Sequence, residues 1–168
     1  MRNEKPPKNI MKAKLYLETT IPSYLVANAS KDPRLAVDQA QTLEWWERHR
    51  ERFDIFVSAV VLREVARGNP AMAAKRMGIL ANIPLLNPSL ESEKLTERLL
   101  ERVIPKNAAE DAAHISLAAV HKMDFLLTWN CAHINNRFTI RRIEKTCAGM
   151  GYQCPVISTP TELMSIDL

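Results

Sequence analysis

A chain of 168 residues is long enough to bury one substantial hydrophobic core, so we expect a single domain over residues 11–168 behind a disordered tail at 1–10. With 46% hydrophobic and 25% charged residues the composition is that of an ordinary globular protein, and no apolar run approaches the roughly 20 residues that cross a membrane. The net charge of +4 is compatible with a polyanionic partner but is too small to demand one.

The N-terminal residues and the cysteines both predict a cytoplasmic protein. A charged beginning without an apolar segment behind it is not a secretory signal. Cys131, Cys147 and Cys154 are irregularly spaced, which fits neither a disulfide framework nor the paired spacing of a zinc site. Cys131 and His133 lack a second pair of ligands that would complete a tetrahedral site. We therefore expect free thiols in a reducing compartment and no membrane association.

The first expected element is a short buried strand over 14–20, an apolar run that ends in Glu18, Thr19 and Thr20. Open α/β sheets bind their ligands at the edge where the carboxyl ends of the strands meet. We refer to this as the carboxyl edge, and we expect Glu18 to lie there. The alternative is a surface glutamate at the start of a turn.

Helices are expected at 21–29 and 34–52. In the second, the 3.6-residue periodicity places Trp46 on the buried face and Trp45 on the polar face. A tryptophan on the polar face is either an isolated exposed side chain, which is common, or a contact for a partner protein.

A second strand is expected at 54–58, with Ser58 as the N-cap of the helix that follows. In that helix Glu64 lies at the margin of the apolar face. Burying a carboxylate there is costly unless a cation compensates it. The alternative to a functional role is a local salt bridge with Arg63 or Arg67.

The middle of the chain predicts a helix at 71–82, a strand at 84–87 and a helix at 89–103, which we interpret as scaffold. A further helix is expected at 108–121, with Asn107 as its cap and Glu110 three residues later.

In the helix at 108–121, Asp111 lies at the edge of the inner face while Glu110 points outward. The alternative role of Asp111 is compensation of the helix dipole, which Glu110 already provides. His114, one turn later, could orient Asp111 or a substrate, or could simply hydrogen-bond a carboxylate.

The last elements expected are a strand at 124–130, a helix at 131–150, a strand at 153–158 and a short helix at 159–163. Basic residues are concentrated in the longer helix: Arg137, Arg141, Arg142 and Lys145. Strands that alternate with helices predict parallel pairing and right-handed crossovers. The fold class expected is therefore α/β, a three-layer α/β/α sandwich.

Seven polar residues are expected at the carboxyl edge: Glu18, Thr19, Ser58, Glu64, Asp111, Thr128 and Asn130. Carboxylates, hydroxyls and an amide supply only oxygen ligands, which suit Mg²⁺ or Mn²⁺ rather than zinc or copper. A divalent cation would relieve the repulsion between carboxylates and could activate water for attack on a phosphodiester.

Other chemistries of this fold class have less support. The chain has four glycines, none in the first strand-to-helix turn, so a phosphate-binding loop is absent from the sequence. A phosphoaspartate enzyme would need aspartate at the position of Glu18, and no nucleophile elbow indicates a catalytic serine.

Several segments in order resemble the successive motifs of PIN-domain proteins, over essentially 11–168. The segments are Leu15-Tyr16-Leu17-Glu18-Thr19-Thr20-Ile21-Pro22, Val57-Ser58 with Glu64-Val65, Glu110-Asp111-Ala112-Ala113-His114-Ile115, Leu126-Leu127-Thr128-Trp129-Asn130 and Ile157-Ser158-Thr159-Pro160 with Glu162-Leu163. The resemblance implies a five-stranded parallel sheet in the order 3-2-1-4-5 and a metal-dependent ribonuclease. It also implies the toxin of a VapBC-type toxin–antitoxin pair.

The resemblance also implies roles for particular residues. Glu18, Glu64 and Asp111 would be the first three acids and metal ligands, and Asn130 the fourth position of the catalytic set. Ser58 and Thr128, together with Thr19 beside Glu18, would be supporting hydroxyls. The family usually has aspartate at the position of Glu18 and often has it at Asn130, so the alternative is a catalytically weakened PIN module that acts through protein or RNA binding.

The expected partners are an RNA substrate, a small antitoxin protein and a second copy of the chain in a homodimer. RNA could follow three arginines: Arg137, Arg141 and Arg142. Trp45 is the candidate contact for the antitoxin.

Overall fold

The computed structural model describes residues 11–166 and contains one five-stranded parallel sheet in the order β3-β2-β1-β4-β5. The strands are β1 (Ala13–Leu17), β2 (Phe53–Ser58), β3 (Leu85–Leu86), β4 (Phe125–Leu127) and β5 (Val156–Ser158). This confirms the expected α/β class and the strand order. The tail expected at 1–10 lies outside the described residues.

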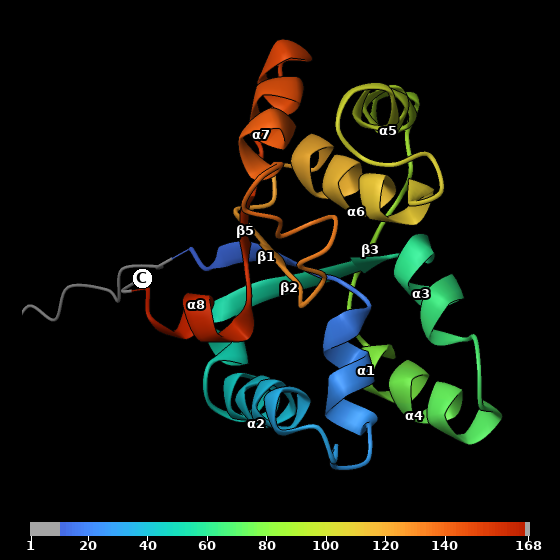
Figure 1. The fold of residues 1–168 in the computed structure, drawn as a ribbon, viewed down its shortest axis with the longest axis vertical. Helices are drawn as coiled ribbons and strands as arrows, with labels where there is room; N and C mark the ends of the chain where they lie inside the picture. The colour runs from blue at the N-terminus through green and yellow to red at the C-terminus, as the bar shows by residue number, and fades with distance from the viewer. Residues whose placement is uncertain (1–10, 167–168) are drawn as a thin grey trace, which may run out of the picture.

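Helices cover both faces of the sheet (Figure 1). The helices are α1 (Thr20–Val26), α2 (Pro33–Arg48), the 3₁₀ turn η1 (Arg50–Arg52), α3 (Ala59–Val65), α4 (Pro70–Leu80), α5 (Leu90–Arg102), α6 (Ala109–Val120), α7 (Ile140–Gly149) and α8 (Pro160–Met164). In Figure 1, α5, α6 and α7 lie above the sheet and α1, α2, α4 and α8 below it, which gives the three layers. None of these helices is long and apolar enough to cross a membrane.

The central strand β1 explains why the sheet needs both helical layers. Leu15, Tyr16 and Leu17 are fully buried, and β1 pairs with β2 on one side and with β4 on the other. A strand with helices on both faces reads as a continuous apolar run, as this one does. The apolar run ends at Glu18, whose backbone N–H donates to the Leu127 carbonyl at 3.1 Å. The central strand therefore delivers Glu18 to the carboxyl edge.

The helix expected at 131–150 is shorter than predicted, because α7 begins only at Ile140. The preceding residues form turns in which asparagine side chains bind the backbone. The Asn136 Oδ1 atom accepts from the Phe138 N–H at 2.9 Å, and the Asn130 Oδ1 atom accepts from the His133 N–H at 3.1 Å. Such local bonds compete with helical hydrogen bonds, so they delay the helix.

The predicted cap of α6 is also wrong. Ala108 occupies the N-cap position without a side-chain hydrogen bond, and Asn107 does not cap the helix. Glu110 points outward as expected, but it forms an ion pair with Arg67 at 2.6 Å rather than closing a capping box.

The burial of the two neighbouring tryptophans of α2 is the reverse of the prediction. Trp45 is fully buried against Phe53, with ring centroids 6.1 Å apart, while Trp46 remains partly exposed. The buried face of α2 runs through Thr42 and Trp45. Thr42 can be buried because its hydroxyl donates to the Asp38 carbonyl and accepts from the Trp129 indole. A buried Trp45 cannot serve as the antitoxin contact.

Replacing Trp45 and Trp129 with phenylalanine should affect the free energy of unfolding unequally. The Trp45 N–H is buried without a hydrogen-bond partner among residues 11–166, whereas the Trp129 N–H donates to Thr42 at 2.7 Å. Removing an unpaired buried donor relieves a penalty of about 1–3 kcal/mol, which offsets the smaller ring volume. We expect Trp45→Phe to change the free energy of unfolding by less than about 1 kcal/mol and Trp129→Phe to lower it by about 1–2 kcal/mol. Urea unfolding followed by circular dichroism measures both, and the reverse order would contradict the hydrogen-bond assignment.

Candidate active site

Glu18 lies at the point where β1 ends, and its carboxylate is almost fully buried, with 3% of the residue exposed. Its Oε2 atom accepts three hydrogen bonds, from the Thr20 N–H at 3.0 Å, the Thr20 hydroxyl at 2.5 Å and the Thr128 hydroxyl at 2.7 Å. Its Oε1 atom accepts none from any residue in 11–166. One oxygen of Glu18 is thus fixed by the protein, and the other is left for a ligand.

Threonines at the ends of β1 and β4 connect these two strands. The Thr20 hydroxyl, which donates to Glu18, also accepts from the Trp129 N–H at 2.8 Å. The Thr128 hydroxyl in turn accepts from the Asn130 N–H at 2.9 Å. Thr20 is a site residue that the sequence analysis did not select, although it belongs to the same Glu-Thr-Thr run.

Glu64 reaches the same edge from α3. The Ser58 side chain caps this helix directly after β2, by accepting from the Val61 N–H at 3.5 Å. Figure 1 shows β1 and β2 leading into α1 and α3 at the same, carboxyl end of the strands. The Glu64 Oε2 atom accepts from the Thr19 hydroxyl at 2.5 Å and lies 2.7 Å from His114 Nε2. Glu64 is therefore connected to β1 and α6.

His114 is fully buried and joins three elements. Its Nε2 atom contacts Glu64, and its Nδ1 atom lies 2.8 Å from the Tyr16 hydroxyl. The Tyr16 hydroxyl is also 2.7 Å from the Ser58 hydroxyl. A continuous chain of hydrogen bonds thus runs from Ser58 through Tyr16 and His114 to Glu64. His114 supports Glu64 rather than Asp111, and this link was not foreseen from the sequence.

The charges in this network stabilise one another. Burial lowers the pKa of His114, but its hydrogen bond to Glu64 and the negative charges of Glu18, Glu64 and Asp111 outweigh this effect, so the pKa lies above its ordinary value. Burial raises the pKa of Glu64, but His114 and the Thr19 hydroxyl outweigh it, so that pKa is lowered. The arrangement favours a histidine cation next to a glutamate anion. Burial also raises the pKa of the Tyr16 phenol, which stays protonated.

Asp111, in the first turn of α6, is held through both of its oxygens. Oδ1 accepts from the Asn130 amide at 2.9 Å, and Oδ2 lies 2.7 Å from His133 Nδ1. The backbone N–H of His133 donates to the side-chain oxygen Oδ1 of Asn130, so this bond fixes the two residues relative to each other. Asn130 therefore positions Asp111 in this structure. His133 was considered in the sequence only beside Cys131; its place in the turn after Asn130 was the available signal.

The three arginines expected to contact RNA are all exposed, Arg137 in the turns before α7 and Arg141 and Arg142 in its first turn. Arg142 lies on α7, which packs against α5, and its guanidinium donates to the Arg102 carbonyl at the end of α5. The guanidinium of Arg142 is thus engaged with the end of α5.

The carboxylate oxygens of the site are ligands of the kind that Mg²⁺ and Mn²⁺ prefer. Within residues 11–166, no group of three or more histidine, cysteine, aspartate or glutamate side chains is arranged to hold a metal. However, Mg²⁺ is commonly held by one or two carboxylates, with water and substrate phosphate completing its shell. Glu18 and Glu64 each present one oxygen that accepts no hydrogen bond from the described residues, whereas both oxygens of Asp111 are engaged. Of the three acids, Glu18 and Glu64 are therefore the two that leave a carboxylate oxygen for a cation.

Comparison with known proteins supports the fold. No family model matches the sequence, and no curated protein matches it. Among solved structures, a chain of the crystal structure of VapBC2 from Rickettsia felis bound to a DNA fragment from their promoter is similar, with a TM-score of 0.53. The match covers 86% of this chain and 97% of the chain in the VapBC2 structure, at 16% sequence identity. At this level of identity the likeness concerns the fold alone.

The fold is consistent with a PIN-like architecture. This PIN-like fold brings three acids from distant parts of the chain to the carboxyl edge, within reach of one buried histidine.

Proposed function

We propose that this protein is a ribonuclease that hydrolyses phosphodiester bonds of RNA with Mg²⁺ or Mn²⁺, and that it is the toxin of a toxin–antitoxin pair. The observation that carries the proposal is the set of contacts that links the acids: the Thr19 hydroxyl, next to Glu18, donates to Glu64 at 2.5 Å, and Glu64 lies 2.7 Å from His114, one turn after Asp111 on α6. The likeness to a VapBC2 structure supports a toxin–antitoxin module, with a small antitoxin as partner.

The side chains would divide the work as follows. Glu18 and Glu64 would hold the cation, which when bound would activate a water and neutralise charge on the phosphate. Thr20 and Thr128 keep Glu18 in place, so that its free oxygen needs little reorganisation when a ligand arrives. Asp111, fixed by Asn130 and His133, would orient a water or the RNA.

Cleavage of a labelled single-stranded RNA tests this function. We expect cleavage with Mg²⁺ or Mn²⁺ and none with excess EDTA. Asp111→Asn should reduce the rate by about 10–100-fold, the range seen when groups that orient a metal site are removed. Cleavage that is indifferent to EDTA or to Asp111→Asn would rule the mechanism out.

The affinity for RNA should depend on salt through exposed arginines. If Arg141 contacts a phosphate, Arg141→Ala should weaken binding uniformly and reduce the slope of log affinity against log salt by about 1. The matched control is Arg34→Ala, which removes an exposed arginine from the first turn of α2 and should leave the slope unchanged. Filter binding at several salt concentrations measures it. Equal slopes for wild type and Arg141→Ala would remove Arg141 from the RNA path.

A second candidate function is a PIN-fold module without catalysis. The engagement of both Asp111 oxygens by Asn130 and His133 favours it, because this acid is not free to bind a cation. Isothermal titration of the folded protein with Mn²⁺ distinguishes the two functions. Heat of binding that is lost in Glu18→Gln supports the nuclease, and its absence supports the binding module.

A further inference from the structure

The outer edge of β2 is open along the first half of the strand. On its inner side β2 pairs with β1 from Phe53 through Phe56. On its outer side the short strand β3 pairs only with Val57 and Ser58. Within residues 11–166 no strand lies beside the outer edge of β2 before Val57.

Pro84 accounts for the early end of the pairing between β2 and β3. The Val57 N–H donates to the Pro84 carbonyl at 3.0 Å, so Val57 presents its backbone to the outer side. Ile55, two residues earlier, presents its N–H and C=O to the same side. In this register the residue that would donate to the Ile55 carbonyl is Pro84, which has no N–H. The Ile83 N–H is turned back to the Leu80 carbonyl at 3.0 Å.

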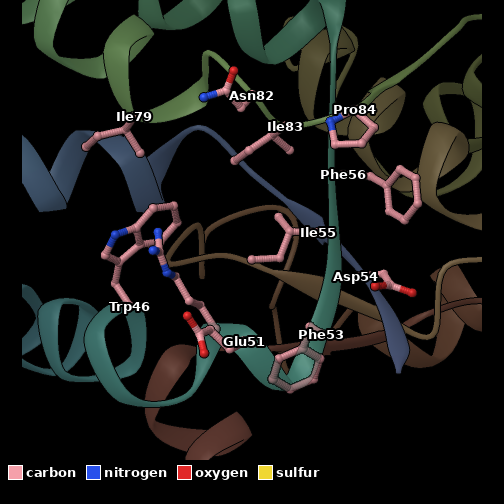
Figure 2. Close-up of a pocket in the computed structure, with 11 residues that line it drawn as sticks. Trp46, Glu51, Phe53, Asp54, Ile55, Phe56, Ile79, Asn82, Ile83 and Pro84 are labelled. Carbon is pink, nitrogen blue, oxygen red and sulfur yellow. The ribbon is translucent and has the colours of Figure 1, made fainter. Parts of the chain in front are cut away.

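A cavity of about 570 Å³ lies against this open edge (Figure 2). Trp46, Ile79 and Ile83 line it on the side to which Ile55 points, and Figure 2 shows Asp54 and Phe56 on the opposite side of the strand. An extended chain placed along β2 would therefore meet apolar side chains on one face. The cavity occupies the space that a longer β3 would fill.

The charges around the cavity favour a basic occupant. Glu51 and Asp54 both line it and are exposed. The lining cation, Arg50, is positioned over the Trp46 ring, 4.6 Å from its centroid. The lining residues thus include two carboxylates and one cation that is already stacked on Trp46, so a lysine or arginine of a partner would find a complementary charge.

We propose that this edge binds an extended segment of a partner polypeptide, which adds as a strand beside β2. Its backbone pairs with the free N–H and C=O of Ile55, as in other cases of strand addition to an open edge. Side chains of a strand alternate between the two faces. An apolar side chain of the segment therefore enters the cavity beside Trp46 and Ile79, and the flanking lysine or arginine side chains lie near Asp54. The proposal concerns a surface separate from Glu18 and does not depend on the nuclease function.

The probe that tests this is the synthetic peptide acetyl-Thr-Lys-Ile-Lys-Val-Lys-Thr-amide, added to the full chain. We expect it to slow hydrogen exchange of the Ile55 amide by about tenfold or more, because this N–H acquires a partner. A peptide with glutamate in place of each lysine is the control and should bind more weakly.

Three variants separate the backbone from the charge contribution. Ile55→Pro removes the outward N–H while Ile55→Val keeps it, and Asp54→Lys reverses an exposed charge of β2. We expect Ile55→Val to bind the peptide like wild type, and Ile55→Pro and Asp54→Lys to weaken binding by about tenfold, the effect of losing one or two polar contacts. Asp54→Lys keeps the test valid if Ile55→Pro does not fold.

Four results would overturn the proposal. The first is an Ile55 amide whose exchange is unchanged at saturating peptide, and the second is equal binding by wild type and Asp54→Lys. The third is concentration-dependent dimerisation that protects Ile55, which would assign the edge to a second copy. The fourth is faster exchange of Ile55 on deletion of residues 1–10, which would assign it to this chain's own N-terminal segment.

Discussion

Replacing Glu18 with glutamine is expected to reduce RNA cleavage about 100-fold or more while leaving the fold intact. Glutamine can keep one oxygen at the position of Oε2, where Thr20 and Thr128 donate, and places its amide nitrogen at the position of the free Oε1. The interaction of a metal with its substrate is worth several kcal/mol, and each 1.36 kcal/mol changes the rate about tenfold. Weaker hydrogen bonds to a neutral acceptor should lower the free energy of unfolding by only about 1–2 kcal/mol.

The control for Glu18→Gln is the same chemical change at Glu44, an exposed residue of α2 that pairs with Arg48. It should leave cleavage and unfolding unchanged. Initial rates on labelled RNA and urea unfolding should be measured on both variants. A Glu18→Gln protein that is folded and keeps more than about a tenth of the wild-type rate would limit Glu18 to a structural role.

Replacing His114 with glutamine is expected to lower the free energy of unfolding by about 2–4 kcal/mol. Removing one partner of a buried ion pair typically costs about 3–5 kcal/mol, and the lower part of that range applies because Glu64 retains some exposure to water. The Glu64 side chain is 18% exposed and that of His114 is 0% exposed. Glutamine can still donate to Glu64, but it carries no positive charge.

The loss should depend on pH in a defined direction. The pKa of His114 is raised in the folded protein, so its contribution is complete below about 6.5, the ordinary histidine pKa, and declines as the pH rises through the raised value. The groups that set this pKa are Glu64, Glu18 and Asp111. In metal-free buffer with EDTA, wild type should lose stability over that interval and His114→Gln should not.

The matched control is His133→Gln, because His133 pairs with Asp111 but its side chain is 37% exposed. Its effect on unfolding should be below about 1 kcal/mol, the typical net contribution of one hydrogen bond to a partly exposed side chain. If the two histidine variants were equally stable, the charge pair of His114 would contribute nothing to folding.

The parallel pairing and the position of Glu18 were predictable because both follow from strong local patterns, whereas the strand order was expected only from the resemblance to PIN-domain proteins. A continuous apolar run that breaks into polar residues predicts a buried strand and its end, and alternation with helices predicts parallel pairing. Asp111 could be placed in the first turn of an inner helix by the same logic. These inferences need only the order of polar and apolar residues along the chain.

The contacts among the site residues could not be predicted, since they depend on side-chain geometry between elements. His114 contacts Glu64 because α3 and α6 both meet β1 at the same edge. Sequence periodicity does not give the distance between residues of two different helices. The helical wheel placed Trp46 on the buried face and Trp45 on the polar face, which is the reverse of what the structure shows. The decisive residue was Thr42, a polar side chain that is buried because its hydroxyl is satisfied within the protein.

The three hydrogen bonds to one oxygen of Glu18 also link the site to the cooperativity of folding. Thr20 donates to that oxygen from the segment that follows β1, and Thr128 donates to it from the segment that follows β4. The carboxylate therefore holds the ends of these two strands together. The Glu18 carboxylate cannot leave both hydroxyls without loosening the contact between the ends of β1 and β4. Fluctuations that expose this acid should therefore be as rare as unfolding of the whole sheet, which gives the most polar part of the molecule the rigidity of its core.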